Sequence, residues 1–173
     1  DHLYSVDQYG SDFYITSNRK SPNFKLVKAP IGNSGENAWV EVIPHRSDVL
    51  LDGIEIFKNY LVISERENGL TQIRIKSWDG KKDFKLKFNE PTYSAYTSVN
   101  PDFNTDLLRY SYTSLVAPNS VFDYNMTNSE TTLLKQQEVL GGYDPKKYKS
   151  ERIFAKATDG TLVPISIVYN INT

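Results

Sequence analysis

Short runs of alternating apolar and polar residues occur along most of the chain, with the period of two that is typical of β-strands. In the run FKLKF, for example, Phe84, Leu86 and Phe88 share one face while two lysines share the other. The pairs Asn68-Gly69 and Asp79-Gly80 separate neighbouring runs and supply the positive φ angles that tight hairpin turns require. The pattern predicts an all-β fold.

The order of the predicted strands repeats about every 48 residues, a spacing typical of repeat architectures. FYITS, LVISE and LRYSYTS are the equivalent strands of three units, and each unit has one strand before this position and two after it. The expected strands begin at Leu3, Phe13, Asn23 and Ala38 in the first unit, at Gly53, Leu61, Leu70 and Phe84 in the second, and at Tyr93, Leu108, Asn119 and Leu133 in the third. Four strands in about 45 to 50 residues predict β-propeller blades. We therefore expect three consecutive four-stranded antiparallel blades in residues 1–141.

The last predicted blade strand lies in a segment with conflicting signals. SETTLLKQQEVLGG has helix-favouring residues between a candidate N-cap, Ser129, and a candidate C-terminal stop, Gly141. Because local propensity is a weak prior, we assign the segment to a strand from its position in the repeat.

The repeat ends near Gly142, so residues 142–173 are expected to form a different element. A polar stretch begins at Asp144-Pro145, and a hairpin that turns at Asp159-Gly160 follows it. The only Met is Met126, and we therefore expect the chain to be part of a longer protein.

Composition excludes several classes of function. The 20 Lys and Arg nearly balance the 21 Asp and Glu, and without a basic run no nucleic-acid partner is expected. No apolar run reaches the roughly 18 to 20 residues of a membrane span, so membrane insertion is not expected. The absence of Cys excludes a disulfide, a thiol nucleophile and Cys-ligated metal, and it favours a reducing compartment such as the cytoplasm.

Candidate catalytic residues are few. A serine hydrolase of the α/β type needs G-x-S-x-G, whereas the nearest string here, around Ser34, has the wrong spacing and looks like a surface loop. His2 and His45 are the only imidazoles, and neither lies in a catalytic or metal-binding motif. We expect no catalytic residue, no metal site and no cofactor. His45 beside Asp48 could act as a general base, but an ordinary loop histidine is the simpler interpretation.

Two other groups of residues have a functional and a structural interpretation. Carboxylate pairs such as Glu65 with Glu67 could serve glycoside hydrolysis, although charge beside turns explains them more simply. Aromatic side chains could form a stacking platform, but their strand spacing favours a core between blades; these are Tyr93, Tyr96, Tyr110, Tyr112, Phe122 and Tyr124.

Several strings in one order carry a family resemblance: NFKLVKAP, WVEVIPHR, LVISERENGL, LRYSYTSLVAP and QQEVLGGYDPKKYKSERIFAKATDGTLVPISIVYN. Together they resemble the oligopeptidase B branch of the prolyl oligopeptidase family of serine peptidases, over nearly the whole chain. The resemblance implies a seven-bladed propeller that admits only short peptides to a peptidase domain carrying Ser, Asp and His, with cleavage after Arg or Lys. It places residues 1–141 in an incomplete propeller ring, residues 142–173 in the connection toward the peptidase domain, and the nucleophile beyond Thr173.

The resemblance also suggests a role for three charged residues at strand ends. Glu65, Arg66 and Arg109 are expected to contact the peptidase domain, although ordinary ion pairs would explain them as well. The main hypothesis is thus a propeller that filters substrates by size and docks on a catalytic domain. The alternative is a free-standing propeller-type module that binds protein or carbohydrate, since fold does not determine function. In either case an incomplete ring exposes strand edges and apolar faces, so we expect the 173-residue chain to self-associate.

Overall fold

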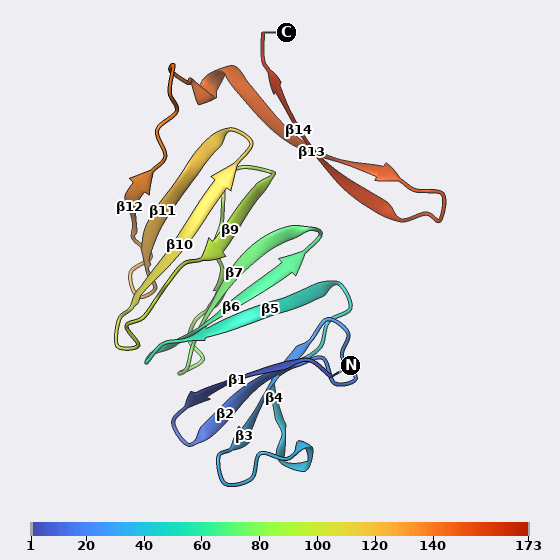
Figure 1. Ribbon diagram of the computed structural model, residues 1–173, viewed down its shortest axis with the longest axis vertical. Coiled ribbons are helices and arrows are strands. Elements are labelled where there is room, and N and C mark those ends of the chain that lie inside the picture. The colour runs from blue at the N-terminus through green and yellow to red at the C-terminus, as the bar shows by residue number, and fades with distance from the viewer. Residues whose placement is uncertain (1, 173) are drawn as a thin grey trace.

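The computed structural model describes residues 2–172, in which the strands form three four-stranded antiparallel sheets and one two-stranded hairpin (Figure 1). In each four-stranded sheet, the strands are hydrogen-bonded in the order of the sequence. The three sheets lie side by side, as expected for consecutive blades. The all-β class and the grouping in fours are confirmed, whereas the number of blades in a complete ring stays a prediction.

The first sheet contains β1 (Tyr4–Tyr9), β2 (Asp12–Ser17), β3 (Lys25–Pro30) and β4 (Val40–Ile43). A short 3₁₀ turn, η1 (Glu36–Ala38), precedes β4. The fourth strand therefore begins two residues later than the sequence pattern predicts.

The second sheet contains β5 (Val49–Ile56), β6 (Tyr60–Glu67), β7 (Leu70–Ser77) and β8 (Asp83–Lys85). Asn68 and Gly69 join β6 to β7 with φ angles of 51° and 77°, which explains why an Asn-Gly pair occurs there. The run FKLKF was expected to be a strand to its end, but pairing stops at Lys85 and only the backbone N–H of Leu86 still bonds β7. Its apolar side chains nevertheless point into the core as expected.

The third sheet contains β9 (Tyr93–Thr97), β10 (Leu107–Ser114), β11 (Ala117–Asn125) and β12 (Thr131–Gln136). The last of these strands confirms the assignment of the ambiguous segment, because pairing with β11 overrides its helical propensity.

A turn of 3₁₀ helix, η2 (Pro145–Lys147), leads from the third sheet to the hairpin of β13 (Tyr148–Lys156) and β14 (Leu162–Asn170). Gly160 has a φ of 89° in the turn, which confirms the predicted hairpin. The hairpin pairs with none of the three sheets and extends away from them (Figure 1). Most of its apolar side chains are exposed, among them Ile153, Phe154, Leu162, Val163, Ile165 and Val168.

Two apolar cores hold the sheets together, one on each face of the second sheet. Along β6, Leu61 and Ile63 point into the core shared with the first sheet, while Tyr60 and Val62 point into the core shared with the third. Because both faces of this strand are buried, its sequence is a nearly continuous apolar run. Of the six aromatic residues considered above, Tyr110 and Tyr124 are buried in the second core, Tyr93, Tyr112 and Phe122 pack against it, and Tyr96 is exposed.

The first sheet also has an open apolar face. Val6, Ile15 and Val27 are cross-strand partners on this face, where Ile15 and Val27 are buried while Val6 and Tyr4 are 47% and 65% exposed. In residues 2–172, no helix combines the length and the apolar character that crossing a membrane requires.

Candidate functional site

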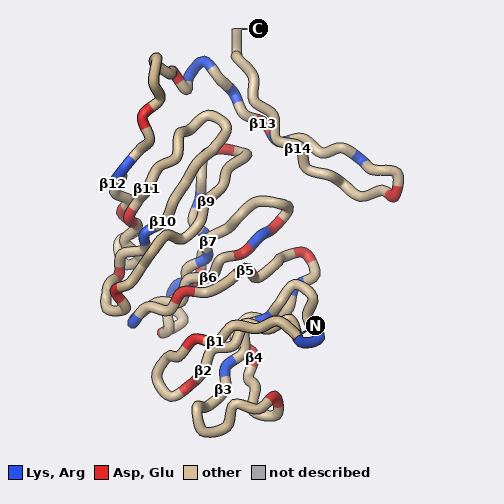
Figure 2. Tube along the Cα trace, viewed as in Figure 1, with Lys and Arg blue, Asp and Glu red and all other residues tan. Residues whose placement is uncertain are grey.

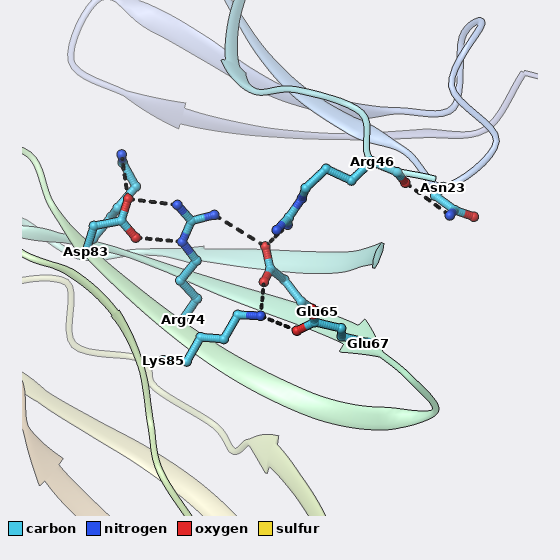
Figure 3. Close-up of polar contacts among 8 residues, drawn as sticks. Asn23, Arg46, Glu65, Glu67, Arg74, Asp83 and Lys85 are labelled. Atoms are coloured by element: carbon cyan, nitrogen blue, oxygen red, sulfur yellow. Dashed lines mark hydrogen bonds and ion pairs between the residues drawn. The ribbon is translucent and has the colours of Figure 1, made fainter. Parts of the chain in front are cut away.

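The strongest concentration of charge lies between the first and second sheets and is centred on Glu65 (Figure 3). Glu65 lies on β6, and its side chain has no exposed surface. Its Oε1 forms an ion pair with Arg46 and lies 3.5 Å from Nη1 of Arg74, while its Oε2 lies 3.7 Å from Nζ of Lys85. A buried carboxylate is tolerated only when cations compensate it, and here three do so.

The alternation of strand residues explains how these groups meet. Glu65 follows Leu61 and Ile63 on one face of β6, and Arg74 on β7 and Lys85 on β8 are cross-strand neighbours on the same face. Arg46 comes from the segment that connects β4 to β5. This segment is held by Asn23, in the connection between β2 and β3, whose Nδ2 donates hydrogen bonds to the carbonyl oxygens of Arg46 and Ser47.

Asp83 extends the network toward the outer strand of the second sheet. Its two carboxylate oxygens accept hydrogen bonds from Nε and Nη2 of Arg74 at 2.6 and 2.7 Å, and Lys76 donates a third at 3.1 Å. The hydrogen bonds from Arg74 hold the pKa of the Asp83 carboxyl below its ordinary value of 3.8, and those from Lys76 add to the effect. The two cations therefore favour the ionised form of Asp83.

Arg66 points to the other face of β6 from Glu65. Its Nη2 lies 3.6 Å from the carboxylate of Asp52 on β5, and both side chains are partly exposed. A cavity of about 420 Å³ lies here between the second and third sheets, and its lining includes Asp52, Glu55 and Arg66. Burial raises the pKa of the Glu55 carboxyl above its ordinary value of 4.5.

Arg109 lies on β10 and belongs to a separate ion pair. Its Nε and Nη2 donate to the two carboxylate oxygens of Asp123 at 2.8 and 2.9 Å, which is the bidentate geometry favoured by guanidinium and carboxylate groups. Of the three residues predicted to contact another domain, the structure thus places Glu65 and Arg66 on one strand and Arg109 on another sheet. Whether any of them contacts another domain stays a prediction.

The hairpin rests on the turns at one end of the second and third sheets. Nη2 of Arg152 donates to the carbonyl oxygen of Asn68, in the turn between β6 and β7. Oγ of Ser150 donates to Oε2 of Glu90 at 2.8 Å, and the hydroxyl of Tyr143 donates to the carbonyl oxygen of Val116 at 2.7 Å.

Gly69 allows the close approach of this hairpin. A Cβ at this position would lie 3.3 Å from Nη2 of Arg152 and 3.4 Å from Cγ of Pro164. We call Asn68 and Gly69, which contact Arg152 and Pro164 of the hairpin, the seat of the hairpin. The sequence shows that the Asn-Gly pair forms a turn. It does not show that the turn contacts the hairpin, because no sequence signal pairs Gly69 with Arg152, 83 positions later.

The seat of the hairpin is close to Glu65 and far from Arg109. Glu65 is three residues before Asn68. Arg109 is five residues from Ser114, the end of β10 that faces the hairpin, and at about 3.3 Å per residue this separation is roughly 17 Å. Ser114 lies at the hairpin end of β10, since it lines a crevice together with Ser166 of β14.

The imidazoles show no catalytic arrangement within residues 2–172. Nε2 of His2 lies 2.8 Å from Oγ of Ser17, but Ser17 has no exposed surface and a substrate could not reach its hydroxyl. Nε2 of His45 is buried without a hydrogen-bond partner, so it forms no hydrogen bond with Asp48. In the same residues, no three His, Cys, Asp or Glu side chains come together as ligands for a metal ion.

Comparison with known proteins identifies what the chain is similar to. The family model described as the prolyl oligopeptidase N-terminal β-propeller domain matches residues 1–137. Dipeptidyl aminopeptidase BI of Pseudoxanthomonas mexicana is 40% identical over 96% of this chain and 23% of its own length. Protease 2 of Moraxella lacunata is 29% identical over 96% of this chain and 24% of its own length.

Solved structures agree with these matches. Oligopeptidase B from Leishmania major superposes with a TM-score of 0.87 at 32% identity, over 99% of this chain and 25% of that protein. Oligopeptidase B from Trypanosoma brucei, in a closed form with covalently bound antipain, superposes with a TM-score of 0.88 at 28% identity, over 99% of this chain and 26% of that protein. The chain spans about a quarter of the length of these relatives.

Proposed function

Since the chain belongs to the prolyl oligopeptidase family, as a part of its N-terminal β-propeller domain, we propose that it filters substrates for a serine oligopeptidase and docks on the peptidase domain of the same protein. Bond cleavage takes place in that other domain. The observation that carries the proposal is the combination of three blade-like sheets with a hairpin that leaves them and presents exposed apolar side chains on both strands.

The docking part of the proposal is supported by the hairpin. β13 and β14 are exposed along most of their length, although they carry many large apolar residues. Apolar surface of this kind marks an interaction site. A peptidase domain following the propeller would cover it, and the seat at Asn68 and Gly69 would then lie at the junction of the two domains. Glu65 and Arg66 are close to this junction, while Arg109 would act from the far end of its blade.

The filtering part is supported by the topology of the sheets. Blades of a propeller surround a central channel, and the first strand of each of the three sheets, β1, β5 and β9, is an edge strand. These strands carry Asp7, Asp52 and Glu55 but no Lys or Arg. We propose that they line the channel and that their carboxylates favour short peptides with Arg or Lys at the cleavage site.

The experiment compares the 173-residue chain with the full-length protein. The full-length protein is expected to hydrolyse a short chromogenic peptide with Arg before the scissile bond and to leave a folded protein uncut, while the 173-residue chain hydrolyses neither. Measurable hydrolysis by the 173-residue chain would overturn the assignment of chemistry to another domain.

Variants of the full-length protein test the individual residues. D52N and E55Q are expected to raise KM for the Arg-containing peptide with little change in kcat. Reversing the charge in R66E or R109E is expected to change peptidase kinetics if these residues contact the peptidase domain, and unchanged kinetics in both would exclude that role.

A further inference from the structure

Arg152 is a guanidinium without a counter-charge at the junction of hairpin and propeller. It forms no ion pair with any residue between positions 2 and 172. Its Nη2 donates to the carbonyl oxygen of Asn68, its guanidinium carbon lies 5.6 Å above the ring of Phe154, and its charge acts on the hydroxyl of Tyr93. Its Nε is buried and has no hydrogen-bond partner. A guanidinium offers five N–H donors, so most of its capacity is unused.

The carboxylates nearest to Arg152 in the sequence or across the turn form ion pairs or hydrogen bonds with other residues. Glu67 is paired with Lys85, Glu90 accepts from Ser150, and Glu151 lies 2.7 Å from Lys149. None of them lies within 4 Å of the guanidinium, so within residues 2–172 its positive charge has no carboxylate partner. Leaving a buried donor such as Nε without a hydrogen bond costs free energy, which a carboxylate partner would remove.

A crevice adjoins the hairpin at the strand position opposite Arg152. Ser166, the cross-strand neighbour of Arg152, lines this space of about 210 Å³ together with Thr92, Tyr93, Ser94, Thr113, Ser114 and Leu115. Thr92 is 3% exposed and its hydroxyl has no hydrogen-bond partner. A hydroxyl without a partner in the crevice, and a guanidinium without an ion pair on the neighbouring strand, suit a carboxylate, whose two oxygens accept several hydrogen bonds.

We infer that Arg152 and this crevice receive an Asp or Glu side chain of the peptidase domain, so that one charged pair aligns the two domains. The inference rests on the proposed function, because it needs a domain that packs against the hairpin. Two observations favour a side chain of the peptidase domain as the occupant. Exposed apolar residues surround Arg152 on β13 and β14, and a following domain would cover them. The relatives are also about four times as long as this chain, which leaves room for such a domain.

The first experiment uses the unmodified sequence. Phenylglyoxal, which reacts with accessible guanidinium groups, is applied to the full-length protein and to the 173-residue chain, and the modified arginines are located by mass spectrometry. Arg152 is expected to react about tenfold more slowly in the full-length protein, because a hydrogen bond between charged groups has to break first. Arg19, whose side chain is 49% exposed, is the internal control and reacts equally in both. Equal rates at Arg152 would overturn the inference, and protection that appears only on adding peptide would assign the crevice to substrate instead.

The second experiment identifies the partner. In the full-length variant R152K, a zero-length carbodiimide crosslink is expected between position 152 and an Asp or Glu beyond residue 173, and R152Q gives none. The pair of Lys28 and Asp12, 3.2 Å apart, reports that the reaction worked. A crosslink confined to residues 1–173, or none where the control pair reacts, contradicts the inference. Peptide hydrolysis is measured separately. A full-length protein that forms the crosslink but hydrolyses no peptide would support the charged pair and reject the proposed function.

Discussion

Arg46, in the segment that connects the first sheet to the second, forms an ion pair with Glu65, which is fully buried on the central strand β6 of the second sheet (Figure 3). The connection between two blades thus supplies part of the charge that allows the next blade to bury a carboxylate. Figure 2 shows that Lys and Arg alternate with Asp and Glu in this region instead of forming a patch of one sign. The network therefore acts in folding and in the docking of neighbouring sheets.

Replacement of Glu65 tests this role. E65Q keeps the shape of the side chain but leaves Arg46, Arg74 and Lys85 without their shared counter-charge. Breaking a buried ion pair from one side is strongly destabilising, so we expect a loss of about 3 kcal/mol in the free energy of unfolding, measured by urea denaturation. The control E36Q removes an exposed pair with Arg19, in which both side chains are about half exposed, and should change stability by less than about 1 kcal/mol.

The apolar contact between the first two sheets is tested at Leu61, which has no exposed surface. L61A deletes buried methyl groups and leaves a cavity, so a loss of about 3 kcal/mol is expected. L107A, at a leucine that is 43% exposed, should cost less than about 1 kcal/mol. Similar losses in both variants would show that the packing of the sheets does not depend on this core.

The seat of the hairpin is tested by comparing two glycines in left-handed conformations. G69A and G80A both place a side chain at a φ near +75°, which costs about 1 to 2 kcal/mol. At Gly80 the added Cβ meets nothing within 4 Å, whereas at Gly69 it crowds Arg152 and Pro164. We expect faster hydrogen exchange along β13 and β14 in G69A alone. Equal exchange rates of β13 and β14 in the two variants would show that Gly69 does not determine how the hairpin packs on this turn.

The pH dependence of stability follows from Asp83. Because the pKa of its carboxyl is below 3.8 in the folded chain, its contribution is fully present above the unfolded pKa and is lost as the pH falls through the folded pKa. The variant D83N lacks this contribution. The difference in urea midpoint between the parent chain and D83N should be constant from pH 7 to about 5 and should shrink below pH 3.8; a difference that grows toward acid pH would contradict the assignment.

Self-association of the 173-residue chain is expected through the open face of the first sheet, where Tyr4 and Val6 are exposed beside a buried apolar cluster. V6K places a charge on this face and should reduce the apparent mass in light scattering at high concentration. V99K changes a valine that is 81% exposed away from this face and should leave the association unchanged. A strictly monomeric parent chain would reject the prediction.

The sequence alone determined the strands, their grouping in fours and the hairpin turns, because the period of two, the repeat and the Asn-Gly and Asp-Gly pairs are local signals. Even the ambiguous segment before Gly141 was assigned correctly from its place in the repeat. The early end of β8 was missed, since the side-chain pattern continues to Phe88 while the backbone pairing does not.

Only the tertiary structure decided which charges meet. Glu65, Arg66 and Arg109 look alike in the sequence as charged residues on strands, yet Glu65 is buried among three cations, Arg66 faces Asp52 and Arg109 pairs with Asp123. The sequence likewise showed no sign of the contact between Gly69 and Arg152. Both results have the same physical reason: ion pairing and close packing depend on distances between residues far apart in the chain, and a local pattern carries no information about those distances.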